Sequence, residues 1–140
     1  MTVVDVAERK ARWRAFAFLF LGALTVALMA FNIRSGGSDF THGIWVGVLA
    51  GCAINLTPVK RWLRPNNAVA RLLDDEATQQ YRQLSCTIGF WGSAAAAIIL
   101  AATTRFHAIL TPPEVAEIIA TAAIASAMLA FAALELRAAR

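Results

Sequence analysis

The stretch Gln83–Thr104, QLSCTIGFWGSAAAAIILAATT, contains 22 consecutive residues without Asp, Glu, Lys or Arg. A helix needs about 20 apolar residues to cross the hydrocarbon core of a bilayer. Three further stretches also lack these charged residues: Ala15–Ile33 with 19 residues, Phe40–Val59 with 20 and Ile118–Leu134 with 17. We therefore predict an all-α membrane protein with four transmembrane helices, at approximately residues 13–33, 40–59, 83–104 and 113–136.

The composition supports a single membrane domain over residues 1–140. Apolar residues make up 59% of the chain and charged residues 16%, whereas soluble domains average roughly 45–50% and about 25%. This balance excludes a soluble globular enzyme and a disordered chain. The net charge of +4 does not predict direct nucleic-acid binding, because basic residues also set membrane orientation and contact anionic headgroups.

Orientation follows from the distribution of Lys and Arg, which are retained on the cytoplasmic side of short loops. The amino-terminal segment, the connection 60–82 and the carboxyl-terminal tail together carry 11 of the 13 basic residues, and the other two connections carry only Arg34 and Arg105. We therefore predict a bacterial inner (cytoplasmic) membrane protein with both termini and the 60–82 loop in the cytoplasm.

The cytoplasmic loop 60–82 is expected to contain a juxtamembrane helix. Pro65-Asn66-Asn67 interrupts the chain, and an Asn is well suited to cap a new helix. No helix-breaking residue follows from Ala68 until the third span ends. The pattern predicts a cytoplasmic helical extension that continues directly into the third transmembrane helix.

Small residues indicate how the helices pack. Gly43, Gly47 and Gly51 recur every four residues in the second span, and Asn55 continues the row. Residues four apart share a helix face, and small residues let another backbone approach closely in lipid. We predict a helix-packing surface there, with Gly89 as a further packing position in the third span, and a homo-oligomer or dimer.

The start of the fourth span carries a capping signal. Thr111-Pro112-Pro113-Glu114 fits the S/T-x-x-E capping box, and proline is well tolerated in the first helical turn. We therefore expect the fourth helix to begin at these prolines.

No motif for catalysis, a cofactor or a metal is found in the sequence, which favours a non-enzyme. The four charge-free stretches contain no ionisable Asp, Glu, Lys or Arg, and such a residue inside a span is the usual mark of an ion pathway. His42 and His107 are expected at the outer face. A metal-binding or pH-sensing site near them is one reading, and two interfacial histidines without such a role are the other.

The run Asp74-Asp75-Glu76 is the only acidic cluster in the predicted cytoplasmic loop. One interpretation is a solvated helix face that pairs locally with Arg71. The other is a docking surface for a soluble partner. The residues assigned to partner docking are Arg71, Asp74, Asp75, Glu76 and Arg82.

Three segments carry a resemblance: Asn55–Pro65, Leu72–Thr78 and Gly89–Trp91. They resemble a group of small bacterial inner-membrane proteins with four helices and no assigned activity, often described beside small helix-turn-helix regulators. The resemblance implies a regulatory or scaffold protein that holds a cytoplasmic partner at the membrane, for example a small transcription regulator. The alternatives are a small oligomeric transporter or channel, and an accessory subunit of a larger membrane complex.

Overall fold

The structure is a computed structural model, and within its described part it consists of helices without strands. It describes residues 3–36, 38–57, 76–104 and 110–138, without the side chains of residues 3–8, 10, 76–77 and 104. The helices are α1 (Val3–Ser35), α2 (Asp39–Leu56), α5 (Glu76–Thr104) and α6 (Pro112–Ala138). The predicted all-α fold is confirmed for these residues.

The turn between α1 and α2 follows from local chemistry. Gly36 has a φ of +70°, a left-handed conformation that glycine adopts without the steric cost of a Cβ and that commonly ends helices. Ser38 then caps α2, because its hydroxyl accepts a hydrogen bond from the backbone N–H of Thr41 at 3.3 Å. These two caps reverse the chain within a few residues.

The end of α2 and the start of α6 each lie next to a proline. Thr57 is extended, with φ −86° and ψ 153°, as expected for a residue that precedes a proline. At the start of α6, the Glu114 carboxylate accepts from the Thr111 backbone N–H at 2.6 Å and from the Thr111 hydroxyl at 2.8 Å. The predicted start of the fourth helix is therefore confirmed.

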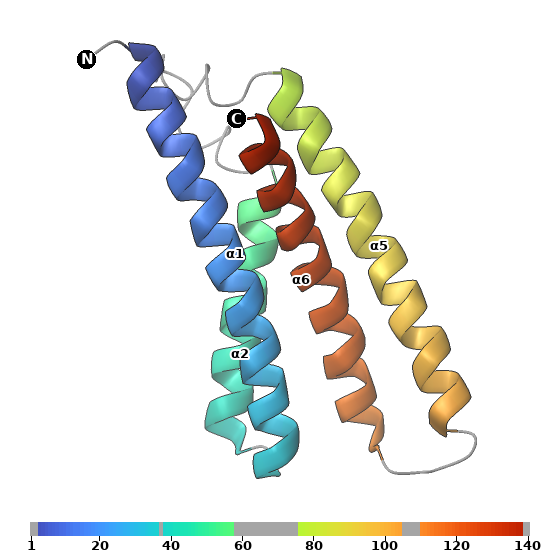
Figure 1. Cartoon of the computed structure of the whole chain (residues 1–140). Coiled ribbons are helices and arrows are strands. Elements are labelled where there is room, and N and C mark those ends of the chain that lie inside the picture. The colour runs from blue at the N-terminus through green and yellow to red at the C-terminus, as the bar shows by residue number, and fades with distance from the viewer. Residues whose placement is uncertain (1–2, 37, 58–75, 105–109, 139–140) are drawn as a thin grey trace.

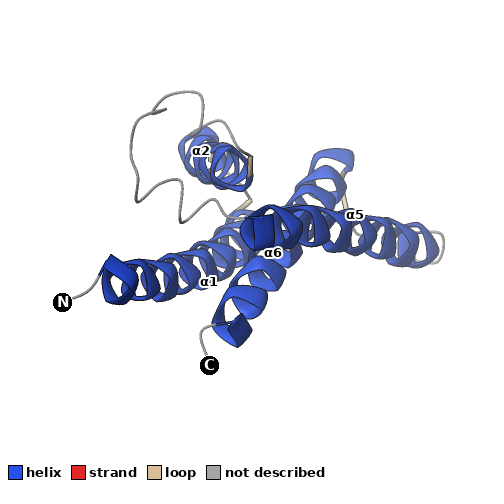
Figure 2. Ribbon diagram, turned by 90° about the horizontal axis from the view of Figure 1, so that it is seen from above, coloured by secondary structure: helices blue, strands red, loops and turns tan. Residues whose placement is uncertain are grey.

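The four helices run alternately up and down, so that both termini lie at one end of the bundle (Figure 1). Viewed from above, α6 lies between α1 and α5, and α2 lies beside α1 and α6, away from α5 (Figure 2). α6 packs against all three other helices, whereas α5 packs mainly on α6. The bundle is therefore organised around its last helix.

Small residues bring α5 and α6 close together. A Cβ added at Gly89 would lie 2.7 Å from the Ala123 carbonyl oxygen and 2.9 Å from the Ala127 Cβ. A Cβ at Gly92 would lie 2.5 Å from the Ser126 hydroxyl. Neither contact leaves room for a side chain, so glycine at these positions sets the distance between the two helices.

The outer surface of the bundle is apolar. The large exposed side chains include Trp13, Phe20, Phe90, Trp91 and Ile98, the reverse of what a water-soluble fold selects. Three segments are long and apolar enough to cross a membrane: Ala11–Ser35, Thr78–Thr103 and Pro112–Ala138. These findings indicate a membrane protein, although α2, with 18 residues, is not among the three.

The expected helical extension before the third span is described only in its last part. α5 begins at Glu76, ahead of the charge-free stretch that starts at Gln83. The remainder of the expected extension, from Ala68 to Asp75, lies outside the described residues.

Candidate functional site: two polar layers on α6

One face of α6 carries two buried carboxylates. Glu117 and Glu135 are 8% and 6% exposed. They are 18 residues apart, which is five full helical turns, so they share a face and lie about 27 Å apart along the axis. This separation is close to the roughly 30 Å hydrocarbon core, which places one carboxylate near each end of the helix.

These carboxylates correct the sequence-based prediction that the spans lack ionisable residues. The charge-free stretch Ile118–Leu134 stops one residue short of each glutamate. The helix itself extends from Pro112 to Ala138, and neighbouring helices provide each of the two side chains with a polar partner. Both glutamates lie within the predicted fourth span, 113–136, but the search for ionisable residues covered only the uncharged run inside it.

The first polar layer lies at the end where α2 and α6 begin, and we call it the His42 layer. His42 Nδ1 lies 2.6 Å from Oε1 of Glu117 and donates to it when the carboxyl group is ionised. One turn deeper, Trp45 Nε1 donates to the Thr121 hydroxyl at 3.0 Å. Both bonds join α2 to α6 and so fix the start of α2.

A third helix brings a buried amide to the same end. Asn32, near the end of α1, is 4% exposed, and neither side-chain amide atom has a hydrogen-bond partner within the described residues. α1 and α6 are antiparallel, with Gly22 packed against Met128 and Leu129. Ten residues further along α1, Asn32 is therefore level with the first turns of α6. A buried amide without a partner is costly, which makes this layer a candidate for an ordered water molecule.

The second polar layer lies at the opposite end, and we call it the Arg14 layer. Arg14 Nε donates to Oε1 of Glu135 at 2.8 Å, and Nη2 donates to the same oxygen. The guanidinium carbon also lies 5.4 Å from the centre of the Phe131 ring, a distance suited to a cation–π contact. The other oxygen of Glu135 is buried and has no hydrogen-bond partner within the described residues.

A cluster of buried, mostly apolar side chains lies between the two layers. Phe18 of α1 and Phe131 of α6 pack with ring centres 4.9 Å apart. Cys52 from α2 and Met128 from α6 are completely buried. The nearby Thr25 hydroxyl donates to the Gly22 carbonyl of its own helix at 2.8 Å, so its hydrogen bond is satisfied locally. The layers are therefore separated by packed side chains.

The predicted glycine row on α2 is uncovered in the structure. A Cβ built at Gly43, Gly47 or Gly51 meets no atom of the described residues within 4 Å. Asn55, which continues the row, donates to the Gly51 carbonyl of its own helix at 2.8 Å. The structure thus leaves this face open, whereas Gly89 lies at a close helix contact.

The predicted docking residues are described only in part. Arg71, Asp74 and Asp75 lie outside the described residues, and Glu76 is described only as the first residue of α5. Arg82 is half-buried on α5.

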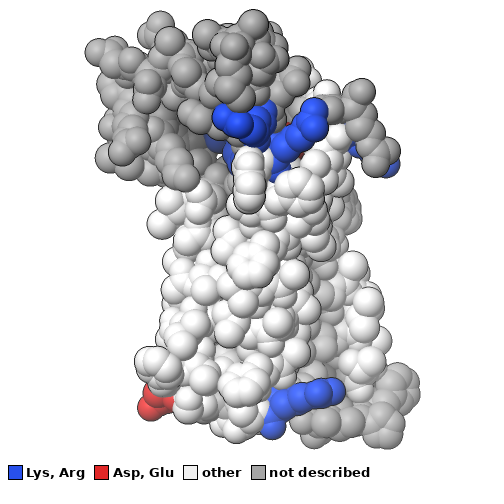
Figure 3. All heavy atoms as spheres, turned by 60° about the vertical axis from the view of Figure 1, so that its left-hand side comes forward, with Lys and Arg blue, Asp and Glu red and all other residues white. Residues whose placement is uncertain are grey.

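Basic side chains gather at the Arg14 end of the molecule. Figure 3 shows Lys and Arg at that end of one face, an uncharged middle, and a single patch of each charge sign at the other end. The described arginines of the Arg14 end come from α1, α5 and α6: Arg9, Arg12, Arg14, Arg82 and Arg137. The described part of the His42 end contributes only Arg34.

The two histidines are not brought together in the described structure. His42 pairs with Glu117, and His107 lies outside the described residues. Among the residues that the structure describes, no three His, Cys, Asp or Glu side chains come close enough to hold a metal ion.

A comparison with known protein families finds no match for this chain, and neither a curated protein nor a solved structure matches it. The resemblance to small bacterial inner-membrane proteins therefore stays a prediction.

Proposed function

We propose that this chain is a non-enzymatic integral membrane protein of regulatory or scaffold type, which holds a cytoplasmic partner at the bacterial inner membrane. One observation carries the proposal: the ionisable side chains buried in the described bundle are paired. His42 pairs with Glu117 at one end, Arg14 pairs with Glu135 at the other, and a buried apolar cluster around Met128 and Phe131 lies between them. These contacts support a role in which the bundle acts through its outer surfaces.

The proposal includes α2 as a fourth span. α2 begins at the His42 layer, and its last residue, Leu56, belongs to the same buried cluster as Ala15, the neighbour of Arg14. α2 therefore accompanies α1 over the distance between the two polar layers. Its 18 residues correspond to about 27 Å, close to the roughly 30 Å of hydrocarbon that a span has to cross.

The proposed orientation places the Arg14 end in the cytoplasm. The described arginines there outnumber those of the His42 end, and α2 ends and α5 begins at that same end (Figure 1). Basic residues are retained on the cytoplasmic side. This orientation puts the predicted docking residues of the 60–82 segment where a soluble partner is able to reach them.

The partner is proposed to contact the acidic run Asp74-Asp75-Glu76 through a basic surface, with Arg71 and Arg82 beside it. A small transcription regulator is one such partner, because proteins that bind DNA carry basic surfaces. Holding it at the membrane would keep it away from DNA. This partner class rests on the sequence resemblance and on charge.

A small oligomeric transporter or channel is the second candidate, and the buried carboxylates favour it. Glu117 and Glu135 lie inside the bundle along a span, where ionisable groups often mark an ion pathway. The uncovered glycine row on α2 also suits a helix of another copy, or of a larger complex in which this chain is an accessory subunit.

A charge-matched co-purification tests the docking proposal. One variant neutralises the acidic run with Asp74→Asn, Asp75→Asn and Glu76→Gln. Its control adds the same charge change nearby on α5 with Gln79→Lys, Gln80→Lys and Gln83→Lys. We expect the first variant to lose its partner in mild detergent and the second to retain it, with both inserted normally. Loss from both variants, or from neither, would contradict docking on the acidic run.

A further inference from the structure

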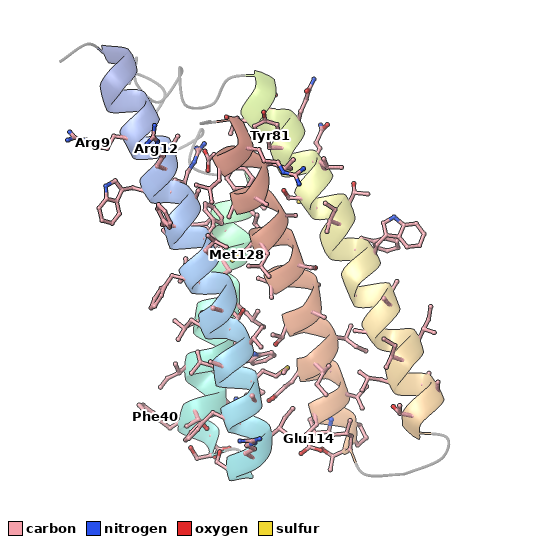
Figure 4. All side chains as sticks on the ribbon, viewed as in Figure 1. Arg9, Arg12, Phe40, Tyr81, Glu114 and Met128 are labelled. Carbon is pink, nitrogen blue, oxygen red and sulfur yellow. The ribbon has the colours of Figure 1, made fainter. Side chains whose placement is uncertain are left out.

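A stripe of four residues on α1 combines charge with exposed aromatic surface. Arg9, Arg12, Trp13 and Phe16 line one hollow of about 420 Å³, within the roughly 300–1,000 Å³ that small-molecule sites occupy. Arg12, Trp13 and Phe16 follow Arg9 by three, four and seven residues, so all four side chains share one helix face. Figure 4 shows Arg9 and Arg12 near the first end of α1, with Arg9 pointing away from the bundle.

The two arginines of the stripe differ from Arg14 on the same helix. Arg14 turns toward α6 and pairs with Glu135. Arg9 and Arg12 are exposed, and neither forms an ion pair with any carboxylate among the described side chains. In the sequence, Asp5 and Glu8 precede them by one turn, on the side away from the apolar segment. Both arginine side chains line the same hollow as Trp13 and Phe16.

The depth of the stripe matches the boundary between lipid headgroups and hydrocarbon. The apolar segment of α1 begins at Ala11, so Arg9 lies before it and Phe16 lies more than one turn inside it. Trp13 and Phe16 are 70% and 57% exposed. Tryptophan is typical of this interface, and aromatic side chains that project outward at this depth contact lipid.

We propose that Arg9, Arg12, Trp13 and Phe16 form a binding site for one anionic phospholipid. The guanidinium groups of Arg9 and Arg12 bind the headgroup phosphate, since planar guanidinium donors match phosphate oxygens. Trp13 and Phe16 contact the glycerol region and the first part of an acyl chain. A free phosphate ion would leave this aromatic half of the site unused, which is why the occupant is a lipid.

The test measures lipid retained by the full chain. Protein purified in mild detergent is mixed with equal amounts of phosphatidylglycerol and phosphatidylcholine, and bound lipid is counted by native mass spectrometry. We expect wild type to retain phosphatidylglycerol preferentially. The pair Arg9→Gln and Arg12→Gln should lower its affinity roughly 30-fold, the factor expected from about 1 kcal/mol for each basic residue at an anionic surface.

Arg137→Gln is the matched control for Arg12→Gln, because Arg137 is exposed at the same end of the bundle but lies outside the stripe. We expect Arg12→Gln alone to lower the affinity for phosphatidylglycerol roughly fivefold and Arg137→Gln to change this affinity little. Trp13→Ala should weaken phosphatidylglycerol binding with both arginines intact. Equal losses from Arg12→Gln and Arg137→Gln would overturn the site in favour of unspecific attraction. Displacement of the lipid by millimolar inorganic phosphate would overturn it in favour of a simple anion site.

Discussion

Glu135 illustrates how a charged side chain is accommodated inside an apolar bundle. Arg14 reaches it from α1 with two donors, and the guanidinium also lies against the Phe131 ring. Arg14 itself keeps a quarter of its side-chain surface exposed, so part of its hydration remains. The pair costs desolvation energy, but removing one partner costs more, because the other charge stays buried.

Breaking this pair on one side should therefore be worse than removing it completely. We expect Arg14→Met to destabilise the protein by roughly 3 kcal/mol, the lower end for broken buried pairs because Arg14 is partly exposed. The double variant Arg14→Met with Glu135→Leu should recover much of this loss. Thermal unfolding in detergent measures both. If the double variant loses the sum of the two single losses, the side chains are not coupled.

The glycines provide a second contrast at the residue scale. Gly89→Ala would place its Cβ 2.7 Å from a backbone oxygen of α6, so the two helices have to separate. We expect a loss of about 1–3 kcal/mol, as for overpacked cores. Gly47→Ala meets no described atom within 4 Å and should be neutral or stabilising by about 0.5–1 kcal/mol. Similar unfolding temperatures for the two variants would contradict the close α5–α6 contact.

At the scale of elements, α2 depends on a few anchors. It joins α6 through His42–Glu117 and Trp45–Thr121 near its start, and Cys52 and Leu56 pack in the core near its end. The opposite face carries the uncovered glycine row. α2 is therefore the helix whose position depends most on individual polar contacts.

The buried thiol of Cys52 makes these anchors measurable. In a Cys86→Ser background, Cys52 is the only cysteine and is completely buried. We expect His42→Gln combined with Trp45→Phe to speed its reaction with a membrane-permeant maleimide severalfold, since α2 separates from α6 more often. Phe40→Leu, which changes an exposed α2 residue, is the control. Unchanged labelling in the double variant would show that the two contacts do not hold α2 in place.

The glycine row makes a separate prediction about assembly. Gly47→Leu adds bulk to a face that touches nothing within the described residues, so the fold of one chain should be unaffected. If a helix of a second copy packs on the row, the same change should reduce the dimer fraction in detergent or in vesicles. Ala50→Leu, which also adds a leucine to the exposed surface of α2, is the control. Gly36→Leu would be less suitable, because the positive φ of Gly36 is strained for leucine. An oligomeric state unchanged by Gly47→Leu would mean that the row faces lipid.

At the scale of the whole molecule, local signals predicted the helices and missed the polar layers. The Thr111–Glu114 box predicted the start of α6 correctly, since a cap acts on neighbouring residues. Arg14 and Glu135 are 121 positions apart, so no local pattern predicts their contact. The spacing of 18 residues between Glu117 and Glu135 does indicate, from the sequence alone, that both lie on one face of a helix. The search for ionisable residues covered only the uncharged run Ile118–Leu134, which lies between these two glutamates, and so it missed both of them.

The glycine row shows the same limit. A repeat of small residues predicts a smooth helix face, but the sequence does not indicate which helix, if any, covers it. In the structure, the glycines in close contact are Gly22, Gly89 and Gly92, of which only Gly89 was assigned to helix packing. Their partners are small or flexible residues of α6 that lie far along the chain.

The central claim is that α2 completes a four-span bundle whose 58–75 connection faces the cytoplasm. Ser35→Cys and Asn67→Cys, each introduced singly into a chain with both native cysteines replaced by serine, test it most directly. A membrane-impermeant maleimide is added to intact spheroplasts. The account predicts that the Ser35→Cys variant is labelled at once and that the Asn67→Cys variant is labelled only after the membrane is permeabilised. Labelling of both variants in intact spheroplasts would place the two positions on one side and show that α2 does not cross the membrane.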